Sequence, residues 1–439
     1  MAQISFAHSC LLYASAVFLL CFQIAEVAAL SVHGLKTLVV YDKRVTDLED
    51  YSKFFNDLNK RSYELQFSSV NENVSDIQLF RGEERLFDNL IVFPVKSRQV
   101  SKGFTAATLL KFFEEGGDIL TVTSPYGLTE SVRTFLNQLG IFPSPRNHEL
   151  RDYFEEGNTT SIHFSSSGTL NPTVFSPMKS ANLSYEGSAA LLDNRDLLIP
   201  IFSAPRTSFT KDPKGGDDWT VGLQGYTVVG FQNLHNARVS WVGSDKFFGN
   251  SHYNDNGEFV QELAKWTFRE KAVIKSTGFK HKHIDGTSYD ELPYKVKDSI
   301  TYEIGFSEWN GKTWIPFNAS DIQFELKMID PYYRLKLLPV RKSEEAQYYS
   351  TGNFMLPDHH GVFTFLTEYQ RSGLSFVTEK DVKSIRHLAN DEYPRSWDIT
   401  NSWVYLTSIC SVIMAWILFV ILYISSSSAM NVPAEKKIN

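Results

Sequence analysis

The sequence contains very little cysteine. Only three of its 439 residues are cysteine, and Cys10, Cys21 and Cys410 all lie in strongly apolar segments near the two ends. Residues 30–402, between these segments, contain none. This long region therefore has no disulfide, no cysteine nucleophile and no thiolate metal site. We expect its stability to come from hydrophobic cores and from partners.

An excess of positive charge is also missing. The formal net charge is -7 at pH 7, so the chain lacks the basic footprint of a nucleic-acid-binding protein. It also lacks long runs of like charge, heptads and repeats of fixed period. Hydrophobic residues make up 43% of the chain, which is enough to form sizeable cores. The length allows two or three domains of roughly 150 residues each.

Residues 1–29 have the pattern of a signal peptide. The apolar run Cys10–Phe22 is too short to span a membrane comfortably, and Val27 and Ala29 follow it in the small-residue spacing that signal peptidase reads. We expect the mature chain to begin at Leu30 or a neighbour. The alternative is an uncleaved anchor, which adds a second span.

Residues 401–424 are expected to form one transmembrane helix. The run from Trp403 to Ile424 has no charged residue, and at about 1.5 Å per residue it is about 33 Å long, close to the hydrocarbon thickness of about 30 Å. Tyr405 and Tyr423 lie near its ends, where amphipathic rings favour the interface. A signal peptide followed by one late span gives a type I protein, with nearly all its mass in the lumen.

The tail, residues 425–439, carries Lys436 and Lys437 at the fourth and third positions from the last residue. Positive charge after the span, with Asp398 before it, places the tail in the cytosol. The two lysines are either a solvated charged end or an address signal, and the type I topology favours the signal.

A stripe of small residues follows one face of the apolar helix. Thr407, Ser411 and Ala415 recur every four residues, and small side chains let a second helix approach closely within lipid. The stripe is either a helix-contact face or a chance of composition.

Four Asn-x-Ser/Thr triplets are candidate glycosylation sites in a chain that passes through the lumen. A fifth triplet, at Asn171, is excluded by its proline. The four acceptors are Asn73, Asn158, Asn182 and Asn318.

Residues 30–270 alternate strand-like and helix-like segments, which predicts an α/β domain with a parallel sheet covered on both faces. Gly116 and Gly140 are expected to end two helices, and Thr46 with Glu49 forms a capping-box pattern at the start of another. The expected strands are 36–41, 63–67, 89–94, 118–123, 197–202, 226–232 and 237–244, and the expected helices are 46–60, 104–117, 127–140 and 256–271.

Residues 271–395 have a different texture. Apolar and polar residues alternate between Gly, Pro and Asn turns, without a long helical pattern. This predicts an all-β, sandwich-like domain.

Few residues suggest chemistry. The chain has no dinucleotide fingerprint, phosphate loop or nucleophile elbow. Gly116–Asp118 is a tempting ligand loop, but a helix C-cap and turn explain it more simply. Residues 243–259 follow a strand and either line a cleft or cap a helix. Two histidine groups, His281 with His283 and Asp358–His360, lack a visible third metal ligand. We therefore expect no catalytic residue, cofactor or metal.

Several long stretches carry a resemblance to a known family. These are FFEEGGDILTVTSP, RTFLNQLGIFPSP, MIDPYYRLKLLP, GVFTFLTEYQRSGLSFV and IRHLANDEYPRSW. They resemble the DDOST family, called the wheat-germ-agglutinin-binding subunit in yeasts, which is the type I single-span subunit of the endoplasmic reticulum oligosaccharyltransferase. The similarity covers the whole chain.

The resemblance implies an essential non-catalytic subunit. The complex transfers a preassembled glycan from dolichyl diphosphate to Asn in Asn-x-Ser/Thr, and a different, multi-spanning subunit with a divalent metal performs the chemistry. The implied partners are ribophorin II-like, DAD-like and catalytic subunits, with the lipid-linked oligosaccharide as a further candidate. The α/β domain is implied to be similar to class I glutamine amidotransferases, without their cysteine nucleophile. Lys436 and Lys437 resemble a dilysine retrieval signal.

Two alternatives belong to other functional classes. A stand-alone lectin-like membrane receptor needs exposed aromatic residues around a polar pocket. A lumenal hydrolase or transferase needs an acid/base pair in a pocket.

Overall fold

The computed structural model describes residues 31–70, 77–98, 100–101, 103–154, 159–177, 181–393 and 401–427. The expected signal peptide, two of the four candidate glycosylation sites (Asn73 and Asn158) and the dilysine pair Lys436 and Lys437 lie outside these residues.

A nine-stranded sheet forms the centre of the first domain, in the order β2-β1-β5-β6-β15-β14-β11-β7, with β12 also paired to β14. Its first five strands run parallel, which confirms the prediction from alternating strands and helices. Four of the five are almost wholly buried and β2 is not. The five are β2 (Glu64–Ser69), β1 (Lys36–Tyr41), β5 (Asn89–Val92), β6 (Asp118–Val122) and β15 (Arg238–Val242).

The other half of the sheet is antiparallel. Strands β14 and β15 are joined by five residues, too few for the crossover that a parallel pair requires, so β14 turns back along β15. The antiparallel strands are β14 (Tyr226–Gln232), β11 (Ala190–Leu192), β7 (Ile141–Pro143) and β12 (Leu198–Ser203). The expected strands at 197–202 and 226–232 therefore exist but run against their neighbours.

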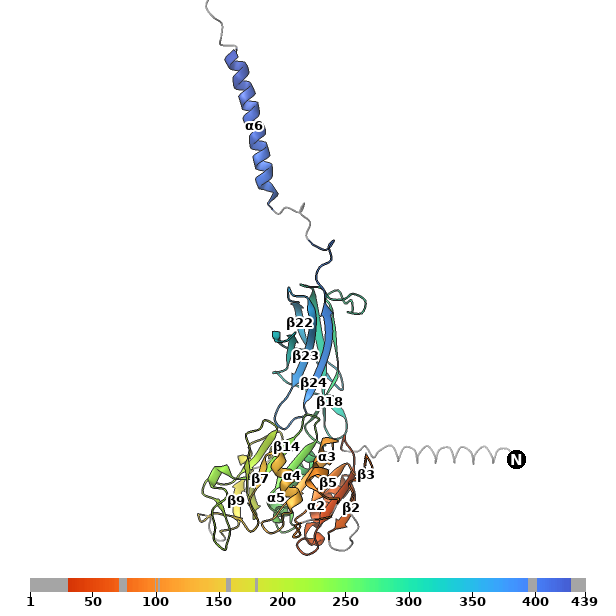
Figure 1. The fold of residues 1–439 in the computed structure, drawn as a ribbon, viewed down its shortest axis with the longest axis vertical. Helices are drawn as coiled ribbons and strands as arrows, with labels where there is room; N and C mark the ends of the chain where they lie inside the picture. Colours follow the sequence, from red (N-terminus) through yellow and green to blue (C-terminus); the bar gives the residue numbers. More distant parts are fainter. Residues whose placement is uncertain are drawn as a thin grey trace, which may run out of the picture.

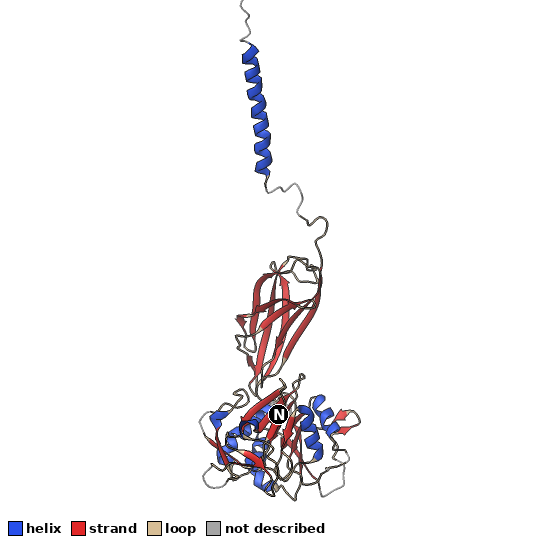
Figure 2. Ribbon diagram, turned by 60° about the vertical axis from the view of Figure 1, so that its left-hand side comes forward, coloured by secondary structure: helices blue, strands red, loops and turns tan. Residues whose placement is uncertain are grey.

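Helices cover both faces of this sheet (Figures 1 and 2). One core contains buried residues of α2 (Ser52–Lys60) and α5 (Tyr253–Thr267), and a second contains those of α3 (Ala106–Glu114) and α4 (Glu130–Leu139). As predicted, Gly116 and Gly140 end α3 and α4 with φ of 94° and 90°.

The capping-box prediction was wrong. A short 3-10 turn, η1 (Leu48–Tyr51), precedes α2, and Asp47 caps it by accepting a hydrogen bond from the N–H of Glu49. The hydroxyl of Thr46 instead donates to the Pro94 carbonyl. Thr46 therefore bonds to a residue distant in the sequence, and not to the neighbouring backbone that a capping box requires.

Small ribbons and turns complete the first domain. The ribbons are β3 (Phe80–Arg81) with β4 (Glu84–Arg85), β8 (Glu149–Arg151) with β13 (Phe209–Lys211), and β9 (Ile162–Ser165) with β10 (Asn182–Tyr185). The 3-10 turns are η2 (Ser166–Gly168), η3 (Gly222–Gln224) and η4 (Lys246–Phe248).

The second domain is all β, as predicted. Two antiparallel sheets enclose one core, which includes Tyr302, Phe324 and Phe365. The first sheet contains β16 (Val273–His283), β17 (Ser299–Trp309), β18 (Trp314–Pro316), β21 (Leu338–Lys342) and β22 (Gln347–Met355). The second contains β19 (Gln323–Lys327), β20 (Pro331–Lys336), β23 (Gly361–Tyr369) and β24 (Val377–Ile385).

A single long helix, α6 (Ser402–Ser427), follows the second domain. The most apolar stretch within Ser402–Ser426 has a mean hydropathy of 2.4, and none of that stretch is buried against the other described residues. Figure 1 shows the helix apart from both domains. Its length and composition fit one membrane span.

Candidate functional site

The carboxyl edge of the parallel strands is where proteins of this class usually bind ligands, at the point where the strand order reverses. Here that point lies between β1 and β5. Buried Asp42 follows β1 and accepts hydrogen bonds from the N–H of Arg44 at 3.0 Å, the Arg44 Nε at 3.1 Å and the N–H of Lys96 at 3.1 Å. Burial opposes the charge, but these bonds outweigh it and hold the pKa of Asp42 below its usual value.

A second arginine crosses the same edge. The guanidinium of Arg146 donates to the carbonyl of Leu128 at 2.8 Å and to that of Lys96 at 3.2 Å. The crevice that holds a ligand in related architectures is thus bridged by the side chains of this chain.

A small cavity lies further along the edge, with a volume of about 160 Å³. Ligand sites usually measure about 300–1,000 Å³. The Tyr126 hydroxyl donates to the Glu149 carboxylate there, and the Lys246 Nζ lies 2.6 Å from the Glu186 carboxylate. Asp245, whose pKa is raised by burial, also lines the cavity. Charged side chains line part of the cavity, but it is smaller than a typical ligand site.

The 243–259 segment combines both interpretations given to it. Asp245 and Lys246 line the small cavity, Lys246–Phe248 form η4, and the residues from Tyr253 onward form the first turns of α5. Ser124, at the turn after β6, has a buried hydroxyl without a hydrogen-bond partner among the described residues. No base activates it there, as a nucleophile requires.

Gly116–Asp118 lies at the opposite, amino edge of the sheet. Asp118 is fully buried, and its Oδ2 lies 2.7 Å from the Nε of Arg269. Its Oδ1 accepts from the N–H of Arg238 at 2.9 Å. The stretch is a helix end and a buried ion pair, as the simpler interpretation holds.

The amino edge also holds the joint between the domains. The guanidinium of Arg238 is fully buried, and burial lowers its pKa to about 9. Its three nitrogens all donate hydrogen bonds, one of them to the second domain. The acceptors are Gln232 Oε1 at 3.0 Å, the carbonyls of Trp266, Lys271 and Ala272 at 2.8, 2.8 and 2.7 Å, and Ser375 Oγ at 3.3 Å.

The loop 372–376, between β23 and β24, supplies the other side of this joint. Asn236 donates to the Phe376 carbonyl at 3.0 Å and accepts from its N–H at 2.6 Å. Three more side chains of the first domain donate to the loop: Trp266 to the Gly373 carbonyl at 2.8 Å, Gln232 to the Leu374 carbonyl at 2.8 Å, and Asn171 to the Ser372 Oγ at 2.9 Å. Sequence reasoning missed this joint, because polar residues ending a buried strand do not reveal which loop they meet.

The histidine pairs have structural partners. His281 lies 2.8 Å from the Tyr294 hydroxyl and 2.9 Å from Asp381, and the His283 Nε2 lies 2.9 Å from the Leu292 carbonyl. The described residues contain no group of three or more potential metal ligands of the His, Cys, Asp and Glu types.

The Asp358–His360 turn is also engaged. Asp358 pairs with Lys297 at 2.7 Å, and the His360 ring lies edge-on to that of His387.

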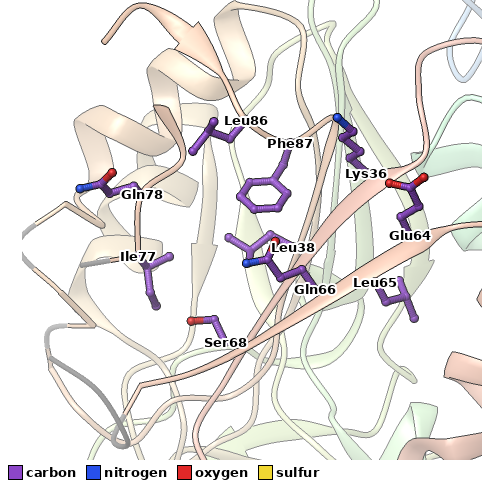
Figure 3. Close-up of a pocket in the computed structure, with 10 residues that line it drawn as sticks. All are labelled: Lys36, Leu38, Glu64, Leu65, Gln66, Ser68, Ile77, Gln78, Leu86 and Phe87. Carbon is purple, nitrogen blue, oxygen red and sulfur yellow. The ribbon is translucent and has the colours of Figure 1, made fainter. Parts of the chain in front are cut away.

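A larger groove of about 580 Å³ lies beside strand β2 (Figure 3). Side chains of β1 and β2 form one side of it, and Ile77, Gln78, Leu86 and Phe87 form the other. The sequence signal was weak, because the β2 stretch ELQFSS alternates like any half-buried strand.

Two candidate glycosylation sites are accessible. Asn182 is exposed at the start of β10, and Asn318 is exposed in the loop between β18 and β19.

The small-residue stripe of α6 presents no spare polar group. The hydroxyls of Thr407 and Ser411 donate to carbonyls within the helix, and Ala415 is exposed beside them. No other described residue covers this face.

The fold and these surfaces define a class: a protein with two tightly joined domains, one candidate membrane-spanning helix among its described residues, and no ligand-sized cavity at the carboxyl edge of its described α/β sheet. Family models for the OST48 N-terminal domain and the OST48 middle domain match residues 28–270 and 281–427. The chain belongs to the OST48 family.

Curated relatives cover nearly the whole chain. The dolichyl-diphosphooligosaccharide–protein glycosyltransferase subunit WBP1 of Saccharomyces cerevisiae is 51% identical over 94% of this chain and 96% of its own. The wbp1 subunit of Schizosaccharomyces pombe is 29% identical over 90% and 93%. The 48 kDa subunit of Danio rerio is 26% identical over 89% and 91%.

Among solved structures, the mmIFT52 N-terminal domain aligns with 53% of this chain and 96% of its own, at a TM-score of 0.40 and 15% identity. A likeness at this level carries no functional argument.

Proposed function

We propose that this chain is a non-catalytic subunit of an oligosaccharyltransferase, the complex that transfers a preassembled glycan from dolichyl diphosphate to Asn in Asn-x-Ser/Thr of nascent proteins. The observation that carries the proposal is the match to the yeast glycosyltransferase subunit over 94% of the chain. A receptor acting alone has no comparable support.

The carboxyl edge of the sheet supports a non-catalytic role. Asp42, Arg44 and Arg146 bridge the usual ligand crevice, and the neighbouring cavity measures only about 160 Å³. Among the described residues, Ser124 lacks the base that a nucleophile needs. Catalysis is therefore assigned to another, multi-spanning subunit.

We further propose that the chain lies in the endoplasmic reticulum membrane as a type I protein. Helix α6 spans the bilayer, both domains lie in the lumen, and Lys436 with Lys437 acts as a dilysine retrieval signal. Exposed Asn182 and Asn318 are proposed to carry glycans, as are Asn73 and Asn158. The Thr407, Ser411 and Ala415 face is proposed to contact a helix of a ribophorin II-like, DAD-like or catalytic subunit.

A pull-down in mild detergent tests this function. The full chain carries an affinity tag, and the eluate is assayed for transfer of a dolichol-linked glycan to an Asn-x-Thr peptide. The same chain purified alone is the control. We expect transfer by the complex and none by the lone chain.

Transfer by the lone chain contradicts the non-catalytic role. An intact chain that brings down neither activity nor a multi-spanning protein contradicts the subunit role.

A further inference from the structure

Strand β2 is an edge of the large sheet, and no other described strand pairs with its outer side. It pairs with β1 over six consecutive residues without a register shift. The N–H of Glu64 donates to the Leu35 carbonyl and that of Val70 to the Tyr41 carbonyl, so even-numbered residues of β2 bond toward β1. By alternation, the N–H and C=O groups of Leu65, Phe67 and Ser69 point away from β1. They bond to no other described backbone group.

The contrast with another sheet edge makes this openness informative. Edge strands are normally protected by proline, lysine, bulges or short length. Strand β21, an edge of the sandwich, contains Pro339 and Lys342 and has a register shift next to Pro339. Strand β7 has only three residues. Strand β2 has six residues, without a proline, a lysine or a bulge.

The groove of Figure 3 runs beside this edge. Apolar Leu38, Ile77 and Phe87 line it together with polar Gln66 and Ser68. The side chains of Gln66 and Ser68 make no hydrogen bond with another described residue, so their polar groups are available. On the opposite face of β2, Phe67 is 42% exposed although its ring packs edge-on against Phe55.

We propose that an extended segment of another subunit pairs with β2 and adds a strand to the sheet. An edge strand offers donors and acceptors at a two-residue spacing, and an extended backbone satisfies them together where a helix cannot. Alternate side chains of the segment enter the groove and contact Leu38 and Ile77. The intervening ones cover Phe67. A matching segment is about six residues long, with mainly apolar side chains facing the groove. The inference rests on the proposed function, because the occupant belongs to the same complex.

Amide hydrogen exchange resolved to single residues tests the pairing. The full chain is compared alone in detergent and within the purified complex. We expect the amides of Leu65, Phe67 and Ser69 to exchange at least about tenfold more slowly in the complex. The amides of Gln66 and Ser68, which bond to β1, are protected in both samples and serve as internal controls.

A matched pair of variants separates backbone pairing from side-chain contact. Phe67→Pro removes an outward N–H but no bond to β1, and proline is tolerated on an edge strand. Phe67→Thr keeps the N–H and removes the ring. In the complex, Phe67→Pro is expected to abolish the added protection of Leu65 and Ser69 or to prevent assembly, and Phe67→Thr is expected to retain both.

Three results overturn the proposal. One is equal exchange at Leu65, Phe67 and Ser69 in the lone chain and the complex. Another is unchanged protection in the Phe67→Pro complex. The third is protection in the lone chain that rises with its concentration, which identifies a second copy as the occupant. If the wild-type chain recovers an active complex but shows one of these results, only this inference fails. If it recovers no complex, the proposed function fails as well.

Discussion

The carboxyl and amino edges of the parallel sheet differ in how exposed their polar groups are and in what those groups contact. At the carboxyl edge, Asp42 and Arg44 form a pair whose arginine side chain is 50% exposed. At the amino edge, Asp118 and Arg238 are fully buried, the Arg269 side chain that pairs with Asp118 is 12% exposed, and Arg238 donates to Ser375 in the loop 372–376 of the sandwich domain. Enzymes of this architecture place their chemistry at the first edge. Here more of the buried, hydrogen-bonded polar groups lie at the second edge. These groups hold the two domains together.

We infer from this difference that the α/β domain is held in a fixed orientation relative to the sandwich domain. A buried cation surrounded by carbonyls tolerates little movement, because each displaced acceptor loses its partner in a low-dielectric environment. The joint therefore fixes the β2 edge relative to the sandwich.

Breaking the joint at its centre should have the largest effect. Arg238→Met keeps much of the side-chain volume but leaves the Gln232 Oε1 and three buried carbonyls without their donor. We expect a loss of about 3–5 kcal/mol in the free energy of unfolding, measured by denaturant titration of the full chain in detergent. Arg44→Met at the carboxyl edge is the matched control and should cost clearly less, because its guanidinium is half exposed and screened by solvent. Equal losses would contradict the contrast between the edges.

A smaller change at the joint should loosen the domains without unfolding either. Asn236→Ala removes both hydrogen bonds to Phe376, at an expected cost of about 1–3 kcal/mol. Spin labels on the two domains should then give a broader distance distribution by pulsed electron resonance. An unchanged distribution would show that the remaining contacts of the loop suffice.

The environment of His33, at the amino edge, predicts that the free energy of unfolding depends on pH. Burial, followed by the charges of Arg269 and Arg85, lowers the pKa of His33 to about 3, whereas its unfolded value is about 6.5. Between these values the unfolded chain binds a proton that the folded chain does not. Stability from this site is therefore complete above about pH 6.5 and falls as the pH drops toward 3, by at most about 1.4 kcal/mol per pH unit.

His33→Asn should flatten this part of the dependence, as measured by thermal unfolding between pH 7 and pH 4. An identical slope in the variant and the wild type would exclude His33 as its source.

The carboxyl edge should have the smallest effect on function. In the assembled complex, Ser124→Ala and Lys246→Ala are each expected to leave glycan transfer unchanged, because these side chains lie beside a cavity smaller than a typical ligand site. A large loss of transfer, with complex assembly intact, would place chemistry at this edge.

Elements governed by local patterns could be predicted from the sequence. Gly116 and Gly140 end their helices because few other residues adopt a positive φ readily. The strand at 36–41 was predicted with the bounds that the structure gives. Alternating texture likewise separated the sandwich from the α/β domain.

Features that depend on distant partners could not be predicted. Thr46 bonds to Pro94 instead of capping a helix, and the direction of β14 follows from a short connection rather than from its own residues. Strand β2 lies at an edge because no other described strand pairs with its outer side. That is a property of the sheet topology, and the six residues of β2 do not reveal it. The joint at Arg238 requires a loop more than a hundred residues away.

That separation has a consequence for synthesis. Arg238 and Ser375 lie 137 residues apart, and translation adds roughly 5–20 residues per second. All residues of the first domain have therefore been synthesised for on the order of ten seconds before the loop 372–376 is made. Until then the side-chain amides of Asn171, Gln232 and Asn236 lack their hydrogen-bond partners in that loop. During that interval the polar side chains at the amino edge of the first domain are exposed on the nascent chain, and they become paired once residue 376 has been added. The joint thus makes the maturation of the first domain depend on the arrival of the second.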